Sequence, residues 1–377
     1  MSHPTFFQSR WYGVAWLLIG LIVAGLGGYP LYQQRKVQPL PIVFANAQKH
    51  WLSEWAPWLK DTRGDTEVYL LSGENSTAEN SGSLLVLGGT HPDEPAGFLS
   101  TLLLLQNAQV SSGRVFVIPR ANASAFSQTE PGEGHPASYP LQIKDGGTIR
   151  MPFGARLTNP LDQWPSPDVK PHYPSGQLLS SKDLRNLNRC FPGKRDGLFT
   201  EQIAAGITEL ITKENINLTV DLHEASLEYP VINALIAHEN SQELASGALL
   251  ELEMENLQYT FEMSPQKLRG LTHRELGDHT KTLPILVETA NVAQGRLRGK
   301  TTVDMIVKGY DAAYLRAVAS GLLKVEYPDS GIPLEVRCGR QLSCIAAYTI
   351  AWNEAHPDLP LIVTGIPTYT SLIANGF

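Results

Sequence analysis

Two histidines and a glutamate in this chain have the spacing and setting of metal ligands. His91 and Glu94 follow an apolar run at 83–87 that predicts a buried strand of a parallel sheet. His223 follows a second run of this kind at 217–222. Open α/β sheets bind ligands at the carboxyl ends of their strands, so we expect these side chains at one edge. Two imidazoles and a carboxylate suit zinc and leave a fourth coordination position open, as in catalytic zinc sites.

An imidazole that binds a metal is usually oriented by a hydrogen bond from its other ring nitrogen. Asp221 lies two residues before His223, and Glu224 follows it directly. Either carboxylate could orient His223, and the sequence leaves both open.

A carboxylate also ends the apolar run at 283–287, where Glu288 follows. Such a residue lies either in solvent at the sheet edge or in the crevice where ligands bind. The two metal-ligand motifs favour the crevice. There, Glu288 could take a proton from a metal-activated water and pass it to a leaving amine.

Basic and amide side chains are concentrated in the segment RNLNRCFPG, which contains Arg185, Asn188, Arg189 and Cys190. A guanidinium is a planar fork that matches a carboxylate, so Arg189 indicates a substrate with a free carboxylate. The alternative is an ordinary basic loop. Cys190 is interpreted as a packed side chain and not as a nucleophile, because the other motifs already supply a metal mechanism.

The strings GGTHPDE, NLNRCFPG, VDLHEA and VETA, in this order, resemble the zinc carboxypeptidase superfamily and, within it, the succinylglutamate desuccinylase/aspartoacylase family. The resemblance covers residues 68–323. It implies one Zn²⁺ per chain, bound by His91, Glu94 and His223, with Glu288 as the general base. It also implies hydrolysis of an amide bond by a promoted water, without a covalent intermediate.

The resemblance further implies that Asn188 and Arg189 bind the substrate's carboxylate. In this family an arginine polarises the scissile carbonyl, and two residues of this chain, Arg156 and Arg185, are candidates for that role. The Pro-Asp pair between the ligands departs from the usual HGNE, which affects the shape of the loop more than its chemistry.

We expect the substrate to be an N-acyl amino acid or a peptide, and the choice between deacylase and carboxypeptidase stays open. The alternative function is a non-catalytic, membrane-tethered module that binds a peptide carboxylate, although such a module needs no general base.

Residues 12–32 contain no charged side chain and carry aromatic residues at both ends. This length is sufficient to cross a hydrocarbon core of about 30 Å. A signal peptide is the alternative, but the sequence lacks a convincing A-x-A cleavage site, so we interpret the segment as an uncleaved, single-pass anchor in the lipid bilayer. The flanking charges favour neither orientation, and the short tail before the segment favours an extracytoplasmic, periplasmic catalytic domain.

Composition indicates a globular enzyme with a large core, since 42% of the residues are hydrophobic and 18% are charged. The net charge is −7, and no basic stripe is visible. Both observations argue against a nucleic-acid partner and against a polybasic lipid-binding surface.

Apolar and amphipathic stretches alternate along the chain, which predicts a three-layer α/β sandwich around a mixed, mostly parallel sheet. Strands are expected at 67–71, 83–87, 114–118, 217–222, 231–237 and 284–287. Helices are expected at 95–106, 200–213, 241–256 and 303–323. The stretch at 127–180 is rich in Pro and Gly, and we expect it to shape the binding site. Five further histidines receive no role: His135, His172, His238, His273 and His279.

The expected organisation is a tail, an anchor, a linker, a zinc hydrolase domain and a β-rich carboxyl-terminal extension, at 1–11, 12–32, 33–41, 42–325 and 326–377. Near the start of the domain, 45–60 is expected to be a helix with three tryptophans on one face. Cys338 and Cys344 enclose a short segment and could form a disulfide in an oxidising compartment.

Overall fold

The computed structural model describes residues 6–36, 39–40, 42, 44–144, 146–323 and 325–377. The chain divides into two compact units, Met1–Pro39 and Leu40–Phe377. Helix α1 (Phe6–Arg35) makes up the described part of the first unit and extends into the expected tail and linker. Residues 1–5 of that tail and 37–38 and 41 of that linker lie outside the described residues. The segment Arg10–Arg35 is long and apolar enough to cross a membrane.

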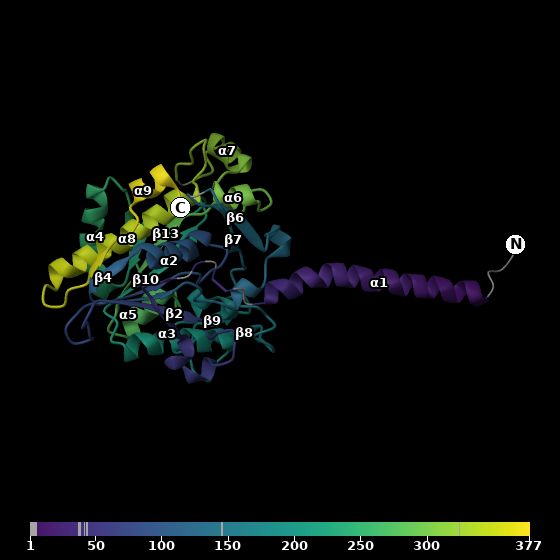
Figure 1. The fold of residues 1–377 in the computed structure, drawn as a ribbon, viewed down its shortest axis with the longest axis horizontal. Helices are drawn as coiled ribbons and strands as arrows, with labels where there is room; N and C mark the ends of the chain where they lie inside the picture. The colour runs from purple at the N-terminus through teal and green to yellow at the C-terminus, as the bar shows by residue number, and fades with distance from the viewer. Residues whose placement is uncertain (1–5, 37–38, 41, 43, 145, 324) are drawn as a thin grey trace. The chain divides into compact units, whose positions relative to one another are not determined.

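An eight-stranded sheet organises the second unit, in the order β1-β2-β5-β3-β10-β13-β11-β12 (Figure 1). Its four central strands, β5, β3, β10 and β13, are parallel to one another. Strands β2 and β11 pair antiparallel with this centre, which confirms the predicted mixed sheet. The bounds are β1 (Gln48–Trp51), β2 (Glu67–Ser72), β3 (Ser83–Leu87), β5 (Arg114–Ile118), β10 (Leu218–Ala225), β11 (Ala234–Ala237), β12 (Thr260–Met263) and β13 (Leu283–Ala290).

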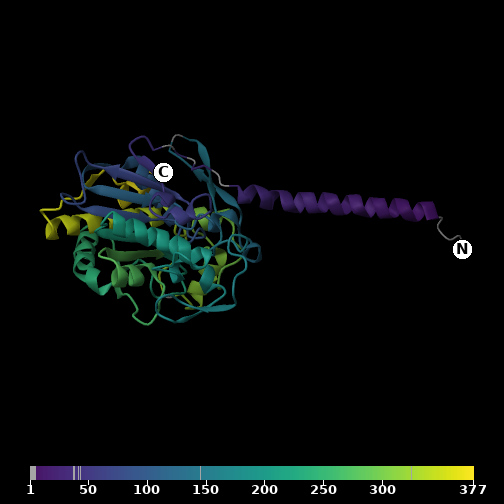
Figure 2. The same cartoon turned by 90° about the horizontal axis from the view of Figure 1, so that it is seen from below.

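Helices cover both faces of this sheet, as the predicted three-layer sandwich requires (Figures 1 and 2). On one face lie α2 (Pro95–Asn107), α4 (Gln242–Met254) and α8 (Leu334–Ala355), and on the other α3 (Phe199–Lys213) and α5 (Thr272–His279). Strand β3 shows why both faces are apolar. Leu84 and Val86 pack in the cluster that contains α2 and α8, whereas Leu85 and Leu87 pack in the cluster that contains α3.

The same alternation directs the candidate site residues to one face. On β10, Leu222 packs with α2, so His223 points to the opposite face. On β13, Val287 packs in the same cluster as Leu222, so Glu288 also points to the opposite face. The register pairs His223 with Glu288 across the two parallel strands, and their side chains are therefore neighbours.

Smaller elements surround this framework. The predicted helix at 303–323 is interrupted near Gly309, whose positive φ of 58° and close contact with the Ile332 carbonyl leave no room for a side chain. The remaining bounds are β4 (Gln109–Ser112), β6 (Ser138–Gln142), β7 (Thr148–Pro152), β8 (Val169–Pro171), β9 (Leu178–Ser180), β14 (Ile362–Thr364), α6 (Val303–Val307), α7 (Ala312–Ala319) and α9 (Tyr369–Asn375).

The expected tryptophan-bearing helix at 45–60 is wrong. Its first part forms β1, which pairs antiparallel with β2, and short 3₁₀ turns follow. Trp55 is buried and its Nε1 donates to Glu214 Oε1 at 2.7 Å, whereas Trp51 is 44% exposed. Strand pairing overrides the helical spacing here, and Pro57 cannot continue a helix because it lacks a backbone N–H.

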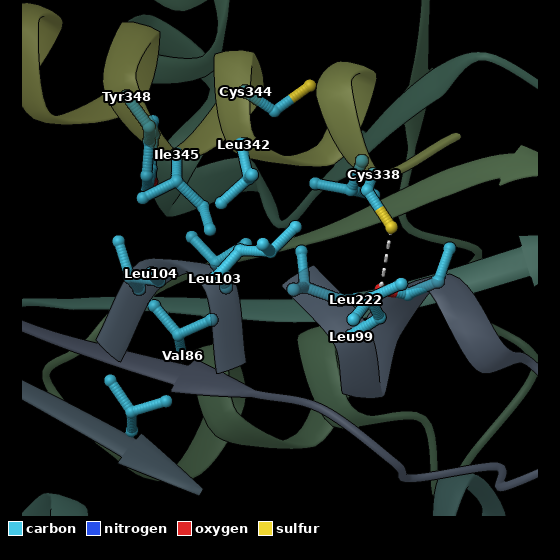
Figure 3. Packing of buried hydrophobic residues seen from close by; sticks show 14 of the residues in the cluster. Val86, Leu99, Leu103, Leu104, Leu222, Cys338, Leu342, Cys344, Ile345 and Tyr348 are labelled. Atoms are coloured by element: carbon cyan, nitrogen blue, oxygen red, sulfur yellow. Dashed lines mark hydrogen bonds between the residues drawn. The ribbon is translucent and has the colours of Figure 1, made fainter. Parts of the chain in front are cut away.

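The expected β-rich extension is wrong for most of its length, because 334–355 form α8 and only Ile362–Thr364 form a strand. Figure 3 shows α8 packed on α2, with Leu342 and Ile345 facing Leu103 and Leu104. The carboxyl-terminal segment thus belongs to the main core of the second unit. A helix buried on nearly every side lacks the amphipathic pattern by which helices are identified.

The three cysteines are free and buried. Cys338 and Cys344 lie six residues apart on one helix, about 9 Å along its axis, which is beyond the reach of a disulfide. Figure 3 shows their sulfur atoms pointing in different directions, with Cys338 Sγ 3.7 Å from the Ala96 carbonyl. The expected disulfide is therefore wrong. Burial raises the pKa of the Cys190 thiol, in agreement with a packed side chain.

Candidate metal centre

His91, Glu94 and His223 meet near the carboxyl ends of β3 and β10, with one ligand atom from each lying within 4.8 Å of the others. His91 Nδ1 is 3.0 Å from Glu94 Oε1, and His223 Nδ1 is 2.9 Å from Glu94 Oε2. The two imidazole rings are 4.7 Å apart, and all three side chains are buried. The structure thus brings together the three residues expected to bind a metal.

The other nitrogen of each imidazole faces an oxygen atom. His91 Nε2 is 2.8 Å from Asn186 Oδ1, which also accepts the backbone N–H of Asn188 and is thereby identified as the amide oxygen. His223 Nε2 is 2.8 Å from Asp221 Oδ2. These contacts favour a proton on each Nε2, so that both Nδ1 lone pairs face Glu94.

A positive charge is needed between these groups. Both oxygens of an ionised Glu94 are hydrogen-bond acceptors, as unprotonated Nδ1 atoms are, so the groups repel unless a proton on His223 or a metal ion lies between them. Two histidines and a glutamate form a ligand set that zinc prefers. The residues present therefore fit a divalent metal such as zinc.

The charges around the ligands suit metal binding. Burial raises the pKa of Glu94, but His91, Arg156 and His223 outweigh it and hold that pKa well below its usual value. Burial lowers the pKa of His91 to about 4, and Arg156 acts in the same direction. Burial also disfavours the charged form of His223, yet Asp221 and Glu94 raise its pKa well above the usual value. Glu94 is thus ionised and His91 neutral near pH 7, as metal ligation requires, whereas His223 would release its proton on binding a metal.

Three further donors hold the Glu94 carboxylate. Arg156 Nη1 lies 2.6 Å from Oε1 and Gln294 Nε2 lies 3.1 Å from it, while the backbone N–H of Glu224 donates to Oε2 at 3.0 Å. Gln294 belongs to no motif of the sequence analysis. Only the fold brings it to the site, across 200 residues of chain.

Asp221 orients His223, and the structure thereby decides between the two candidates. Its Oδ1 accepts the hydroxyl of Thr90 at 2.8 Å, and its Oδ2 accepts that of Thr272 at 2.6 Å. Glu224 points to the opposite face of β10. Asn186 orients His91 in the same way. The sequence motifs did not indicate this role, although Asn186 lies inside the RNLNR string.

A buried ion pair lies behind β10. Glu224 Oε1 accepts from Arg337 Nη1 at 2.8 Å, and Glu224 Oε2 accepts the backbone N–H of Ala96 at 2.9 Å. Arg337 also donates to the Ile306 carbonyl, and its side chain is fully buried. Burial raises the pKa of Glu224 to about 7, despite the opposing effect of Arg337.

One turn further along α8, Gln341 contacts the backbone of a ligand residue. Its Nε2 donates to the His223 carbonyl at 3.0 Å and to Thr289 Oγ1 at 3.3 Å. Its Oε1 accepts from Ser100 Oγ at 2.9 Å. Helix α8 therefore supports the strand ends that carry His223 and Glu288.

A cavity of about 390 Å³ opens on the α5 side of the sheet. His223 and Glu288 line it together with the expected substrate-binding residues Asn188 and Arg189. Apolar side chains form much of the remaining wall, among them Ile236, Leu271 and Leu286. The cavity thus combines the metal-ligand end with polar and apolar surfaces, as a small-molecule or peptide site does.

Glu288 has an unpaired carboxylate oxygen. Its Oε2 is buried and makes no hydrogen bond within the part of the chain that the structure describes. Burial raises the pKa of Glu288 to about 8. A buried polar atom without a partner costs free energy, so its presence indicates a functional role.

The arginines expected in the site differ in position. Arg189 Nη1 donates to the Asn188 carbonyl at 2.6 Å, and the Asn188 amide oxygen accepts the backbone N–H of Thr272 at 2.8 Å, which leaves its NH₂ for a ligand. Arg156 lines the cavity and is 37% exposed. Arg185 lies outside the cavity, where its Nη1 donates to the Thr158 carbonyl at 3.3 Å.

No protein-family model matches the chain, and no curated protein matches its sequence. Solved structures that match include the ectoine utilization protein EutE (DoeB) of Ruegeria pomeroyi, with 19% identity over 70% of this chain and 62% of that one, at a TM-score of 0.38. A succinylglutamate desuccinylase of Silicibacter sp. matches with 18% identity over 71% and 64%, at 0.36. A metallo-carboxypeptidase of Burkholderia cenocepacia matches with 9% identity over 82% and 66%, at 0.46.

These structures come from the two groups of proteins that the sequence motifs resemble. The chain spans less than two thirds of the length of the two first-named proteins.

Proposed function

We propose that this protein is a zinc-dependent amide-bond hydrolase, with one Zn²⁺ per chain bound by His91, Glu94 and His223. One observation carries the proposal. Ligand atoms of these three residues converge within 4.8 Å, and one of the three residues, His223, lines a cavity together with Glu288, whose carboxylate has an oxygen unpaired among the described residues. A metal site beside an unpaired buried base is the arrangement needed to activate water.

Each residue has a task in the proposed reaction. When bound, the zinc supplies a Lewis acid that polarises a carbonyl and lowers the pKa of water. Glu288 takes the proton of the attacking water and gives it to the leaving amine. Arg156 is placed to stabilise the negative charge that develops on the carbonyl oxygen.

Asn188 and Arg189 would bind the free carboxylate of the substrate. Their NH₂ and guanidinium groups belong to one wall of the cavity, which also contains Glu288. The proposed substrates are N-acyl amino acids or peptides with a free carboxyl end, and the chain acts as a deacylase or as a carboxypeptidase. Turnover of a panel of both types by the zinc-loaded full chain decides between them. Binding without turnover on the whole panel would favour the carboxylate-binding module.

Replacing His223 with Ala should remove zinc from the folded protein, because it deletes one of only three proposed protein ligands. Zinc per chain, measured by elemental analysis, is expected to fall from one to near zero, while His279→Ala should leave it unchanged. His279 is a suitable control because it is partly exposed and lies outside the cavity. In the parent, zinc affinity should decrease as the pH falls through the raised pKa of His223, because a proton on this imidazole competes with the metal. Unchanged stoichiometry in the folded His223 variant would reject the metal assignment.

Arg189→Lys should raise KM for carboxylate substrates, because a point charge replaces a bidentate fork. The expected loss is about 1.5–3 kcal/mol, or roughly 10- to 100-fold. Replacing the substrate carboxylate with an amide should impair the parent similarly and the variant little further. Arg195→Lys, at an exposed position nearby, is the control. An unchanged KM in Arg189→Lys would transfer the role to Arg156 or Arg185.

We further propose that α1 anchors the protein in the bilayer and that the catalytic unit lies outside the cytoplasm. After carbonate washing, the full-length protein should stay in the membrane fraction, whereas a variant without residues 1–35 should be released. A protease added to intact spheroplasts should reach the catalytic unit. Release of the full-length protein by carbonate would show that the segment is cleaved or does not span the membrane.

A further inference from the structure

One histidine without a role in the sequence analysis lines the proposed substrate cavity. His273 is the second residue of α5 and is only 3% exposed. Its Nδ1 lies 2.7 Å from Ser264 Oγ. Its Nε2 makes no hydrogen bond among the described residues, so this nitrogen is the ring atom available to a ligand. The preceding residue, Thr272, bonds to Asn188 and thus ties His273 to the proposed carboxylate site.

Neighbouring residues determine which nitrogen of His273 carries the proton. Ser264 Oγ accepts the Nε–H of Arg274 at 3.1 Å, and among the described residues His273 Nδ1 is the one acceptor for its own hydrogen. Arg274 also donates to the Ser264 carbonyl at 2.7 Å, which fixes the serine in place. Burial lowers the pKa of His273 to about 3, and the ring is therefore neutral near pH 7. The proton of this neutral ring lies on Nε2, which makes it a donor in the cavity.

We propose that His273 binds the substrate by donating its Nε2–H to an oxygen on the amino-acid half, either the free carboxylate or a side-chain oxygen. This inference rests on the proposed hydrolase function. The nearby wall of the cavity includes the apolar side chains of Ile236, Leu271 and Leu286, which offer this donor no partner. An Nε2–H that faces the cavity can bond to a substrate oxygen there in place of water.

Two substitutions separate a donor from a residue that only packs. His273→Gln retains an N–H near the position of Nε2, whereas His273→Phe retains the ring and removes the donor. If His273 donates to substrate, Phe should lower kcat/KM by about 10- to 100-fold, mainly through KM, and Gln should recover most of the loss. If the ring only fills space, His273→Phe should keep the parent's kcat/KM and His273→Gln should lower it. His279→Phe, on the same helix but outside the cavity, is the control.

Two substrates identify which oxygen is bound. They carry Leu or Gln at the position with the free carboxylate, in the acyl or peptide series that the parent cleaves. A loss in His273→Phe with both substrates assigns the contact to the carboxylate, and a loss with Gln alone assigns it to the side chain. Equal kinetics of parent and His273→Phe on both substrates would overturn the inference.

Binding of the free amino acids L-leucine and L-glutamine to the zinc-loaded full chain, measured by calorimetry, is the readout that requires no turnover. Their affinity should fall in His273→Phe and largely return in His273→Gln, while zinc per chain stays at one. If the parent itself hydrolyses nothing on the panel, the proposed function fails. If the parent is active and the Phe variant equals it in kinetics and binding, only the role of His273 fails.

Discussion

Glu288→Gln should lower kcat by about 10²–10⁴-fold, the usual scale for a positioned proton transfer, and should leave zinc and substrate binding nearly unchanged. The substitution keeps the size of the side chain and removes only its ability to take a proton. Because Oε2 of Glu288 makes no hydrogen bond with the described residues, the amide should cause little rearrangement. Single-turnover and steady-state rates, with zinc analysis, measure the effect.

Glu262→Gln is the matched control, since Glu262 is another glutamate of the same cavity but is exposed on β12. It should change kcat by less than about threefold, because this exposed carboxylate takes no part in the proposed proton transfer. Full activity in Glu288→Gln would discard the promoted-water mechanism. Full activity in both variants would show that neither glutamate is the general base.

Arg337→Leu is expected to destabilise the protein by about 3–5 kcal/mol, because it leaves Glu224 as a buried carboxylate without its partner. Chemical denaturation of the full chain in detergent measures this loss in the free energy of unfolding. Arg340→Leu is the control on the same helix. Arg340 is only half-buried and stacks on tyrosine rings, so its loss should stay within about 1 kcal/mol.

The loss in Arg337→Leu should depend on pH. Glu224 already has a raised pKa of about 7 in the folded protein, and without the arginine this pKa should rise further. A folded-state pKa above the unfolded value means that stability falls as the pH rises through the interval between them. The variant should therefore be closest to the parent near pH 5 and furthest from it above pH 7. Glu224→Gln in the Arg337→Leu background should restore part of the stability, and no restoration would contradict the ion-pair explanation.

The sequence predicts the parts of the site that lie at the ends of strands. His91, His223 and Glu288 each follow an apolar run, and the run predicts both the strand and the edge of the sheet that the residue reaches. Strand parity then places His223 and Glu288 on one face. These predictions succeed because the relevant information is local.

Residues whose role depends on distant contacts were not predictable in this way. Gln294 reaches Glu94 across 200 residues, and Gln341 reaches the His223 carbonyl across 118. Neither position has a local pattern that indicates its partner. The sequence pattern predicts a β-rich segment where α8 lies for a related reason. This helix is buried in the main core and carries Arg337 and Gln341 among its apolar residues, so it lacks one polar face.

Helix α8 also determines where this protein can be cut. A fragment that ends at residue 325 would retain every motif residue of the candidate site. It would nevertheless expose the apolar surface of α2 and the sheet beneath α8, leave Glu224 without Arg337, and leave the His223 carbonyl without Gln341. Boundaries drawn around the motifs alone would thus give a fragment prone to aggregation, whereas an expression boundary near residue 40 would keep the core whole.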